Sequence, residues 1–356
     1  EWFAWMQWLE AHPEVEPFAD FELYFSAVLA RIDRTFLDFV YPNIEHTIRL
    51  EEIVWGGVAA KTGIPALDHP KMIPASEATY LGDNERVFGI VINGDIRAYP
   101  YRFMDWHEML NDTIGGEPVA LAYCTLCASG ILYSARRGEA DGRYVFGSSG
   151  LLYRSNKLMY DVETDTLWNQ FSGRPAAGRL VGRGITLAVL PLVTTTWREW
   201  RRLHPDTVVM HPVTEFERNY EYTAQSPYES YFSSKKLMFP AVVDDREQKP
   251  KTRAFVLRVS GAERAWPLRA FRGGKVLNDR LRALHVVLVG DARSRSVRAY
   301  RGNGSEFTKA RDLTQVLARG AAWSVTEEAL VGPDGQRLTR LPGHLAYWFA
   351  WQGYFD

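Results

Sequence analysis

Cysteine is scarce in this 356-residue sequence, which contains only Cys124 and Cys127. Two cysteines exclude a fold built on several disulfides, and they place every thiol of the chain in one Cys-x-x-Cys motif. Long apolar runs are missing as well, since no stretch reaches the roughly 18 residues that a membrane-spanning helix needs. Neither sign of charge dominates, because 42 basic and 43 acidic residues leave a formal net charge of -1. We therefore expect no nucleic-acid partner.

The composition that remains is ordinary for a globular protein, with 46% hydrophobic and 24% charged residues. The length corresponds to about two domains. Residues 1–81 begin with apolar side chains at helical spacing and continue through a turn-rich stretch, which predicts an N-terminal helical region and an extended lead-in. Trp2, Trp5 and Trp8 suit either the foot of a membrane anchor upstream of residue 1 or a helix packed on the main domain.

From Arg86 onward the pattern is typical of strands. Residues 87–92 and 96–99 flank Asn93-Gly94, which predicts a β-hairpin with a type I′ turn. Helices are expected at 103–112 and at 195–203. Because strands are many and helices few, we expect an α+β, mainly antiparallel β architecture.

An internal repeat divides this β-rich part of the chain. A shift of 167 residues places 86–133 over 253–300 without a gap and with 14 of 48 positions identical, and a second block matches at a shift of 151. We therefore predict two degenerate copies of one β-rich module. The first module would span 82–212, a linker 213–249 and the second module 250–356.

Differences between the two copies separate the scaffold from candidate chemistry, because residues that the fold requires should recur in both. Three residues of the first copy have no counterpart in the second: His107 aligns with Gly274, Cys124 with Asp291 and Cys127 with Ser294. We expect the first module to contain the functional site and the second to support it.

Several longer segments resemble the bacterial and archaeal family of proteins of unknown function numbered 3179, from about residue 50 onward. They are Trp55-Gly-Gly-Val58, Gly63-Ile-Pro-Ala-Leu67, Tyr99-Pro100, residues 106–112, Tyr123-Cys-Thr-Leu-Cys127, residues 149–161, residues 195–200 and His204-Pro205. The resemblance implies no established activity. Members of this family are often exported with an N-terminal signal or membrane segment, which implies an extracytoplasmic protein, in the periplasm or at the cell surface.

The leading functional hypothesis is a metal site formed by His107, Cys124 and Cys127. Two thiolates and an imidazole suit copper, with zinc as the alternative, and three ligands leave an open position for a substrate. The ion would serve a copper-dependent oxidoreductase acting on a small molecule or peptide. We expect Met159 or Met104 as a possible fourth ligand, and Tyr153 and Asn156 in the wall of a pocket. Asp105 or Glu108 would accept a hydrogen bond from the other ring nitrogen of His107, and His204 and His211 are spare ligands.

Two other interpretations stay open. One Cys-x-x-Cys motif is equally compatible with a redox-active dithiol or with a merely structural pair. A non-enzymatic reading is also possible, in which an exported binding or assembly module presents a partner surface.

Overall fold

The computed structural model describes every residue except 139–141, 217–219, 221–226, 245, 260 and 356, so parts of the predicted linker 213–249 lie outside the described residues. The fold is mostly antiparallel β-sheet with N-terminal helices, as predicted. The described α-helices are α1 (Trp2–Ala11), α2 (Phe21–Ile32), α3 (Tyr101–His107), α4 (Trp197–Leu203), α5 (Glu229–Ser233) and α6 (Trp348–Phe355). Short 3-10 helices span Arg34–Asp38, Leu50–Glu52, Ala75–Glu77 and Leu268–Phe271.

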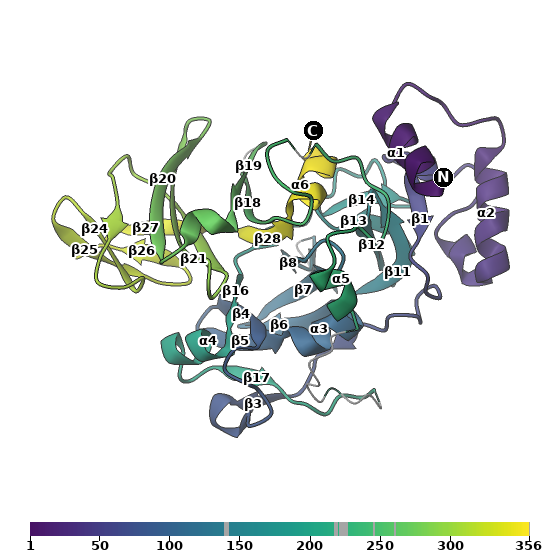
Figure 1. The fold of residues 1–356 in the computed structure, drawn as a ribbon. Helices are drawn as coiled ribbons and strands as arrows, with labels where there is room; N and C mark the ends of the chain where they lie inside the picture. Colours follow the sequence, from purple (N-terminus) through teal and green to yellow (C-terminus); the bar gives the residue numbers. More distant parts are fainter. Residues whose placement is uncertain (139–141, 217–219, 221–226, 245, 260, 356) are drawn as a thin grey trace.

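Two five-stranded sheets form the centre of the first module (Figure 1). One has the order β16 (Val193–Thr196), β4 (Arg86–Ile92), β5 (Asp95–Pro100), β17 (Val208–Met210) and β3 (Met72–Pro74). The other has the order β15 (Val189–Leu190), β8 (Ser129–Ser134), β7 (Glu117–Cys124), β6 (Met109–Ile114) and β2 (Leu67–Asp68). The predicted hairpin is confirmed as β4 and β5, where Asn93 and Gly94 both have the positive φ that a type I′ turn requires.

A third five-stranded sheet lies toward the N-terminal helices. Its order is β1 (Ile53–Trp55), β11 (Phe146–Tyr153), β12 (Asn156–Asp161), β13 (Leu167–Asn169) and β14 (Arg174–Ala177), and β9 (Arg136–Arg137) pairs separately with β10 (Gly142–Arg143). Every residue of β11 and β12 is buried. Phe36, Phe39 and Val40 cover one face of this sheet, which explains why the N-terminal region packs here.

The predicted helix over 103–112 is wrong in its second half. Helix α3 ends at His107 because Glu108 adopts a left-handed conformation, with φ of 56°. The chain then enters β6, which pairs along its length with β7. The helix predicted at 195–203 begins at Trp197, since Thr195 and Thr196 belong to β16 and pair with β4. Sheet pairing outweighed helical spacing at both places.

The second module consists of a three-stranded and an eight-stranded sheet. The first has the order β19 (Ala262–Pro267), β18 (Arg253–Val259) and β28 (Gly343–Tyr347). The second has the order β20 (Lys275–Leu281), β21 (Leu284–Asp291), β22 (Ser296–Arg301), β27 (Arg337–Leu341), β26 (Ala329–Val331), β25 (Ala321–Val325), β24 (Gln315–Ala318) and β23 (Thr308–Lys309).

Strand order corresponds between the two modules. β16-β4-β5 matches β28-β18-β19, and β15-β8-β7-β6 matches β27-β22-β21-β20. The bounds of β18, β19, β21 and β22 lie 167 residues after those of β4, β5, β7 and β8. The duplication itself stays a prediction, but this agreement lets each residue of the first module be compared with a structural counterpart in the second.

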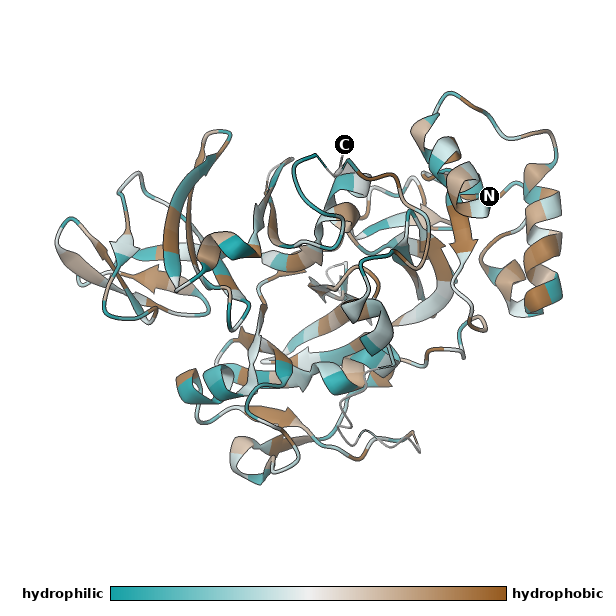
Figure 2. Cartoon of the chain, viewed as in Figure 1, coloured by the Kyte–Doolittle hydropathy of each residue, from teal (hydrophilic) through white to brown (hydrophobic). Residues whose placement is uncertain are grey.

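The N-terminal helices expose many apolar side chains. On α1, Trp2, Trp5 and Trp8 are 48%, 60% and 41% exposed, and Figure 2 shows hydrophobic segments on α2, which stands at the edge of the molecule. No helix in the described part of the chain is long and apolar enough to cross a membrane.

Candidate functional site

The two cysteines lie in a tight connection between the central strands β7 and β8. Cys124 is the last residue of β7 and pairs with Ser129, the first residue of β8. Between them the chain turns, the amide of Ala128 donating to the carbonyl of Thr125. We call Cys124–Ala128 the cysteine loop. The hairpin geometry of β7 and β8 therefore holds both thiols on one short, well-anchored segment.

Both cysteines are free thiols, and their side chains face each other. The Cys124 thiol donates to Cys127 Sγ across 2.8 Å. Cys127 Sγ in turn lies 3.1 Å from Asn156 Oδ1 and 3.3 Å from the carbonyl oxygen of Ser155. Cys124 is 2% exposed and Cys127 is fully buried. The pair is thus a close dithiol inside the protein core.

A buried ion pair lies beside this dithiol. Lys157 Nζ is 3.0 Å from Glu108 Oε2, and both side chains are almost completely removed from solvent. Thr125, inside the cysteine loop, donates to Glu108 Oε1 across 3.0 Å, and Ser148 donates to Glu108 Oε2 across 3.4 Å. The left-handed backbone of Glu108 directs its carboxylate to the loop rather than along helix α3.

The surroundings disfavour a thiolate at Cys127. Burial, the hydrogen bond from Cys124 and the negative charge of Glu108 together hold the pKa of the Cys127 thiol well above its ordinary value. A raised pKa reduces the fraction of nucleophilic thiolate at neutral pH. Cys127 is therefore held as a protonated thiol at rest.

Segments distant in the sequence cover the cysteine loop. The Tyr231 hydroxyl, on α5, donates to the carbonyl of Leu126 across 2.8 Å. The amide of Tyr347, at the end of β28, donates to the carbonyl of Cys127 across 2.7 Å. Because β28 belongs to the second module, both modules and the linker take part in holding the loop.

His107 does not join the cysteines. Its Nδ1 lies 2.7 Å from the carbonyl of Pro65, and its Nε2 contacts the hydroxyl of Tyr220, so both ring nitrogens have hydrogen-bond partners. Within the residues that the structure describes, no three His, Cys, Asp or Glu side chains form a group able to hold a metal ion. The three residues predicted as a ligand set are therefore not gathered at one point.

The other predicted residues divide into two groups. Asn156 contacts Cys127, and Met159 belongs to the same buried core cluster as both cysteines. Met104 packs in the core cluster around Tyr99 and Phe103, and Tyr153 in the one below the N-terminal helices. Glu108 pairs with Lys157, and Asp105 is buried on α3. His204 lies near Glu327, and His211 contacts the backbone of Val213.

Sequence reasoning missed Thr125, Ser148, Tyr231 and Tyr347. Thr125 lies between the two cysteines of the Cys-x-x-Cys motif, so the sequence alone places it next to the thiols. Tyr347 lies 220 residues from Cys127 in the chain, and its contact is made by its backbone amide. A backbone contact of this kind has no signature in a single sequence.

Comparison with protein families agrees with the resemblance seen in the sequence motifs. The profile of the family described as "Protein of unknown function (DUF3179)" matches residues 61–356, which include both modules and the cysteine loop. The chain belongs to this family. A search of the curated proteins found no match, and a search of solved structures found none. The DUF3179 assignment names no activity, so the function must be argued from the site.

Proposed function

We propose that the protein is a thiol–disulfide redox protein whose working couple is the Cys124–Cys127 dithiol and its disulfide. The observation that supports this most directly is the 2.8 Å separation of two free thiols on one loop. That separation exceeds a disulfide bond by only about 0.8 Å, so a small rotation of either side chain closes the bond.

The spacing of the sulfurs favours this chemistry over metal chelation. Two thiolates that bind one tetrahedral ion at about 2.3 Å each lie about 3.8 Å apart, which is wider than the 2.8 Å found between Cys124 and Cys127. His107 already has hydrogen-bond partners at both ring nitrogens. Copper binding, with zinc as the alternative, stays a prediction, and the metal content of the purified protein tests it.

The oxidant we assign is a disulfide of low molecular mass. A thiolate at Cys124, the cysteine with residual exposure, attacks one sulfur of that disulfide and releases the other as a thiol. Cys127 then attacks the mixed disulfide, gives its proton to the second leaving sulfur and completes the Cys124–Cys127 bond. Two electrons and two protons thus pass from the protein to the small molecule, which becomes two thiols.

We expect the oxidised state to be the favoured one. Desolvation and the negative charge of Glu108 raise the pKa of Cys127, so the reduced form gains no stabilisation from a thiolate. We therefore expect a low reduction potential, below about -250 mV, and slow exchange limited by access to the cysteine loop.

Stoichiometric reaction with oxidised glutathione tests this function. The fully reduced protein should release two glutathione molecules per chain and retain none, while Cys124→Ser and Cys127→Ser should each form at most one stable mixed disulfide. Met159→Leu, a change in the same core cluster that keeps both thiols, serves as the matched control. Release of no glutathione from the wild-type protein under conditions that oxidise free cysteine would contradict the proposal.

An extracytoplasmic location fits the proposed chemistry, because disulfides persist in oxidising compartments. The exposed tryptophans of α1 support a place near a membrane surface, since indole rings favour the interface. Fractionation of cells that produce the protein from its full gene tests this location. Recovery only in the cytoplasmic fraction would contradict it.

A further inference from the structure

A large cleft lies between the two modules, away from the cysteine loop. It has a volume of about 1040 Å³. One wall is formed by helix α4 and residues 84–86 of the first module. The other is formed by strands β21 and β22, residues 309–314 and residues 325–327 of the second module. A cleft of this size accommodates a small-molecule ligand.

The cleft is strongly basic. Seven of its lining side chains are arginine or lysine and four are carboxylates, and one of the seven, Arg198, pairs with Asp83 just outside the lining, which leaves an excess of two positive charges. The carboxylates are already engaged within the protein. Glu199 pairs with Arg202 across 2.7 Å, and Asp312 accepts hydrogen bonds from Thr314.

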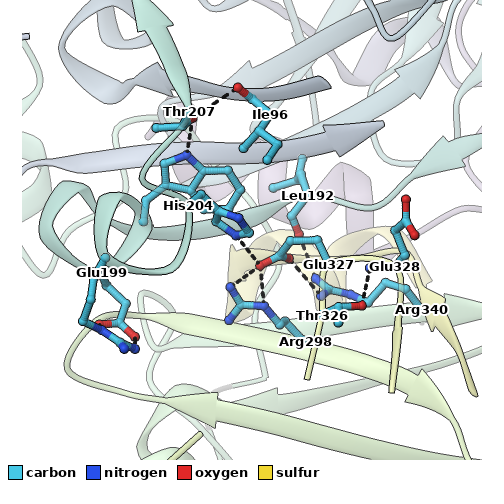
Figure 3. Close-up of polar contacts among 12 residues, drawn as sticks. Ile96, Leu192, Glu199, His204, Thr207, Arg298, Thr326, Glu327, Glu328 and Arg340 are labelled. Atoms are coloured by element: carbon cyan, nitrogen blue, oxygen red, sulfur yellow. Dashed lines mark hydrogen bonds and ion pairs between the residues drawn. The ribbon is translucent and has the colours of Figure 1, made fainter. Parts of the chain in front are cut away.

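Arg298 and Glu327 line the cleft and form a buried cluster with Arg340. Figure 3 shows Glu327 between Arg298 and Arg340, with His204, the residue that follows helix α4, contacting the same carboxylate. Burial alone would raise the pKa of Glu327, but Arg298, His204 and Arg340 hold it well below its usual range. One buried carboxylate thus faces two buried guanidiniums, of which Arg298 lines the cleft.

Cations at the rim have no carboxylate partner. Arg293 and Arg311 are exposed, and neither forms an ion pair with any residue that the structure describes. Lys309 Nζ donates to the carbonyl of Gly273 across 3.1 Å, which fixes its ammonium at the entrance. All three side chains line the cleft.

The cleft coincides with the site positions of the second module. It is lined by Gly273, Gly274, Asp291 and Ser294, which align with Trp106, His107, Cys124 and Cys127 at the shift of 167 residues. At Gly274 an added Cβ would lie 3.1 Å from Lys309 Nζ and 3.3 Å from Leu313, so the glycine keeps this wall open. At these aligned positions the first module has a buried dithiol, whereas the second module has an accessible basic cavity.

We propose that this cleft binds a small polyanion bearing two or more phosphate or carboxylate groups. Guanidinium groups bind such oxyanions through paired hydrogen bonds, and a basic concave site between low-dielectric walls concentrates anions from solution. The inference does not depend on the redox function, because no lining residue belongs to the cysteine loop.

Isothermal titration calorimetry on the full chain tests the cleft, with inorganic pyrophosphate and citrate as separate probes at low ionic strength. We expect saturable one-to-one binding of at least one probe. The Arg293→Glu/Arg311→Glu variant should weaken it about tenfold or more. Arg183→Glu, an equally exposed change outside the cleft, should leave it unchanged.

Two results would overturn the proposal: no saturable binding of either probe, or an equal loss in Arg183→Glu, which would indicate a general charge effect. Which probe binds more tightly separates phosphate from carboxylate preference. The titration is repeated with the Cys124→Ser/Cys127→Ser protein, where unchanged binding separates this site from the thiol chemistry.

Discussion

Glu108 and Lys157 form an ion pair beside the cysteine loop. Their ion pair is buried, and the carboxylate also accepts hydrogen bonds from Thr125 and Ser148. A buried charge that loses its partner is strongly destabilising, whereas an exposed pair contributes little. The loop conformation therefore rests on keeping both charges.

Replacing Glu108 by glutamine should lower the free energy of unfolding by about 3 kcal/mol, because the Lys157 ammonium would stay buried without a counter-charge. The same change removes a negative charge that raises the Cys127 pKa, so the thiol should react faster with iodoacetamide at neutral pH. Urea unfolding and timed alkylation measure the two effects. Glu328→Gln, which disrupts an exposed pair with Arg337, is the control and should change stability by less than about 1 kcal/mol. Equal losses in both variants would contradict the assigned role.

His344 should make stability depend on pH. Burial lowers its pKa to about 4 from an ordinary value of 6.5, so between these values the unfolded chain binds a proton that the folded chain does not. The contribution of neutral His344 to the free energy of unfolding is fully present above about pH 6.5. It is lost as the pH falls toward 4, by about 3 kcal/mol in total. His344→Phe should flatten that part of the pH profile of the melting temperature while keeping the contact with Phe171. An unchanged profile would show that the histidine is not responsible.

At the scale of elements, helix α5 acts as the cover of the cysteine loop. The Tyr231 hydroxyl donates a hydrogen bond to the Leu126 carbonyl of the loop, and Tyr231 is itself 5% exposed. We therefore expect this short helix, rather than the sheet, to limit access to the thiols.

Tyr231→Phe should open this cover more often. Loss of the hydroxyl leaves the Leu126 carbonyl without that donor, at a cost of about 1 to 2 kcal/mol, so alkylation of the native thiols should accelerate severalfold. Native-state labelling followed by mass spectrometry measures the rate. Tyr24→Phe on the exposed face of α2 is the matched control. Identical rates in both variants would argue that α5 does not limit access.

Strand β8 depends on Gly130, its second residue after the cysteine loop. A Cβ at Gly130 would lie 2.2 Å from the ring of Phe88, in the packed core between two sheets. Gly130→Ala should therefore cost about 1 to 3 kcal/mol in unfolding free energy. Gly142→Ala, where the nearest atom stays 3.4 Å away, should change it little. The denaturant midpoints of the two variants measure this difference. An unchanged midpoint for Gly130→Ala would show that Phe88 and its neighbours can move aside to accept the added methyl group.

Local signals predicted some elements and not others. The hairpin of β4 and β5 was predictable because Asn93-Gly94 specifies its own turn. The helix over 103–112 was extended too far because apolar spacing cannot register the left-handed backbone at Glu108 or the pairing of β6 with β7. Cys124 and Cys127 were predictable as a pair from their spacing alone, whereas the partners of His107, the Pro65 carbonyl and the Tyr220 hydroxyl, are tertiary contacts that no local pattern encodes.

At the scale of the whole molecule, the two modules contribute different features. The first contains the dithiol, the second contributes the Tyr347 amide that holds Cys127, and the basic cleft lies where they meet. Sequence comparison of the two copies identified which positions differ, but the cleft was not predictable, because it needs the relative placement of α4 and β22.

Oxidation should stabilise the whole molecule. A disulfide between Cys124 and Cys127 closes a very short loop, so the gain is small in chain entropy and arises mainly from removing two buried polar thiols. We expect the oxidised protein to melt a few degrees above the reduced protein. Calorimetry of both forms, with Cys124→Ser/Cys127→Ser as the redox-insensitive control, checks this. A lower melting temperature after oxidation would show that the bond strains the loop.

The most direct test of the central claim is intact-mass measurement after equilibration of the full chain over a graded series of thiol–disulfide buffers, with acid quenching and alkylation. The account predicts one reversible two-electron transition, in which the oxidised chain has lost two hydrogen atoms and neither cysteine is alkylated. Two alkylated cysteines at every potential, or protein isolated with one equivalent of copper or zinc that protects both thiols, would contradict it.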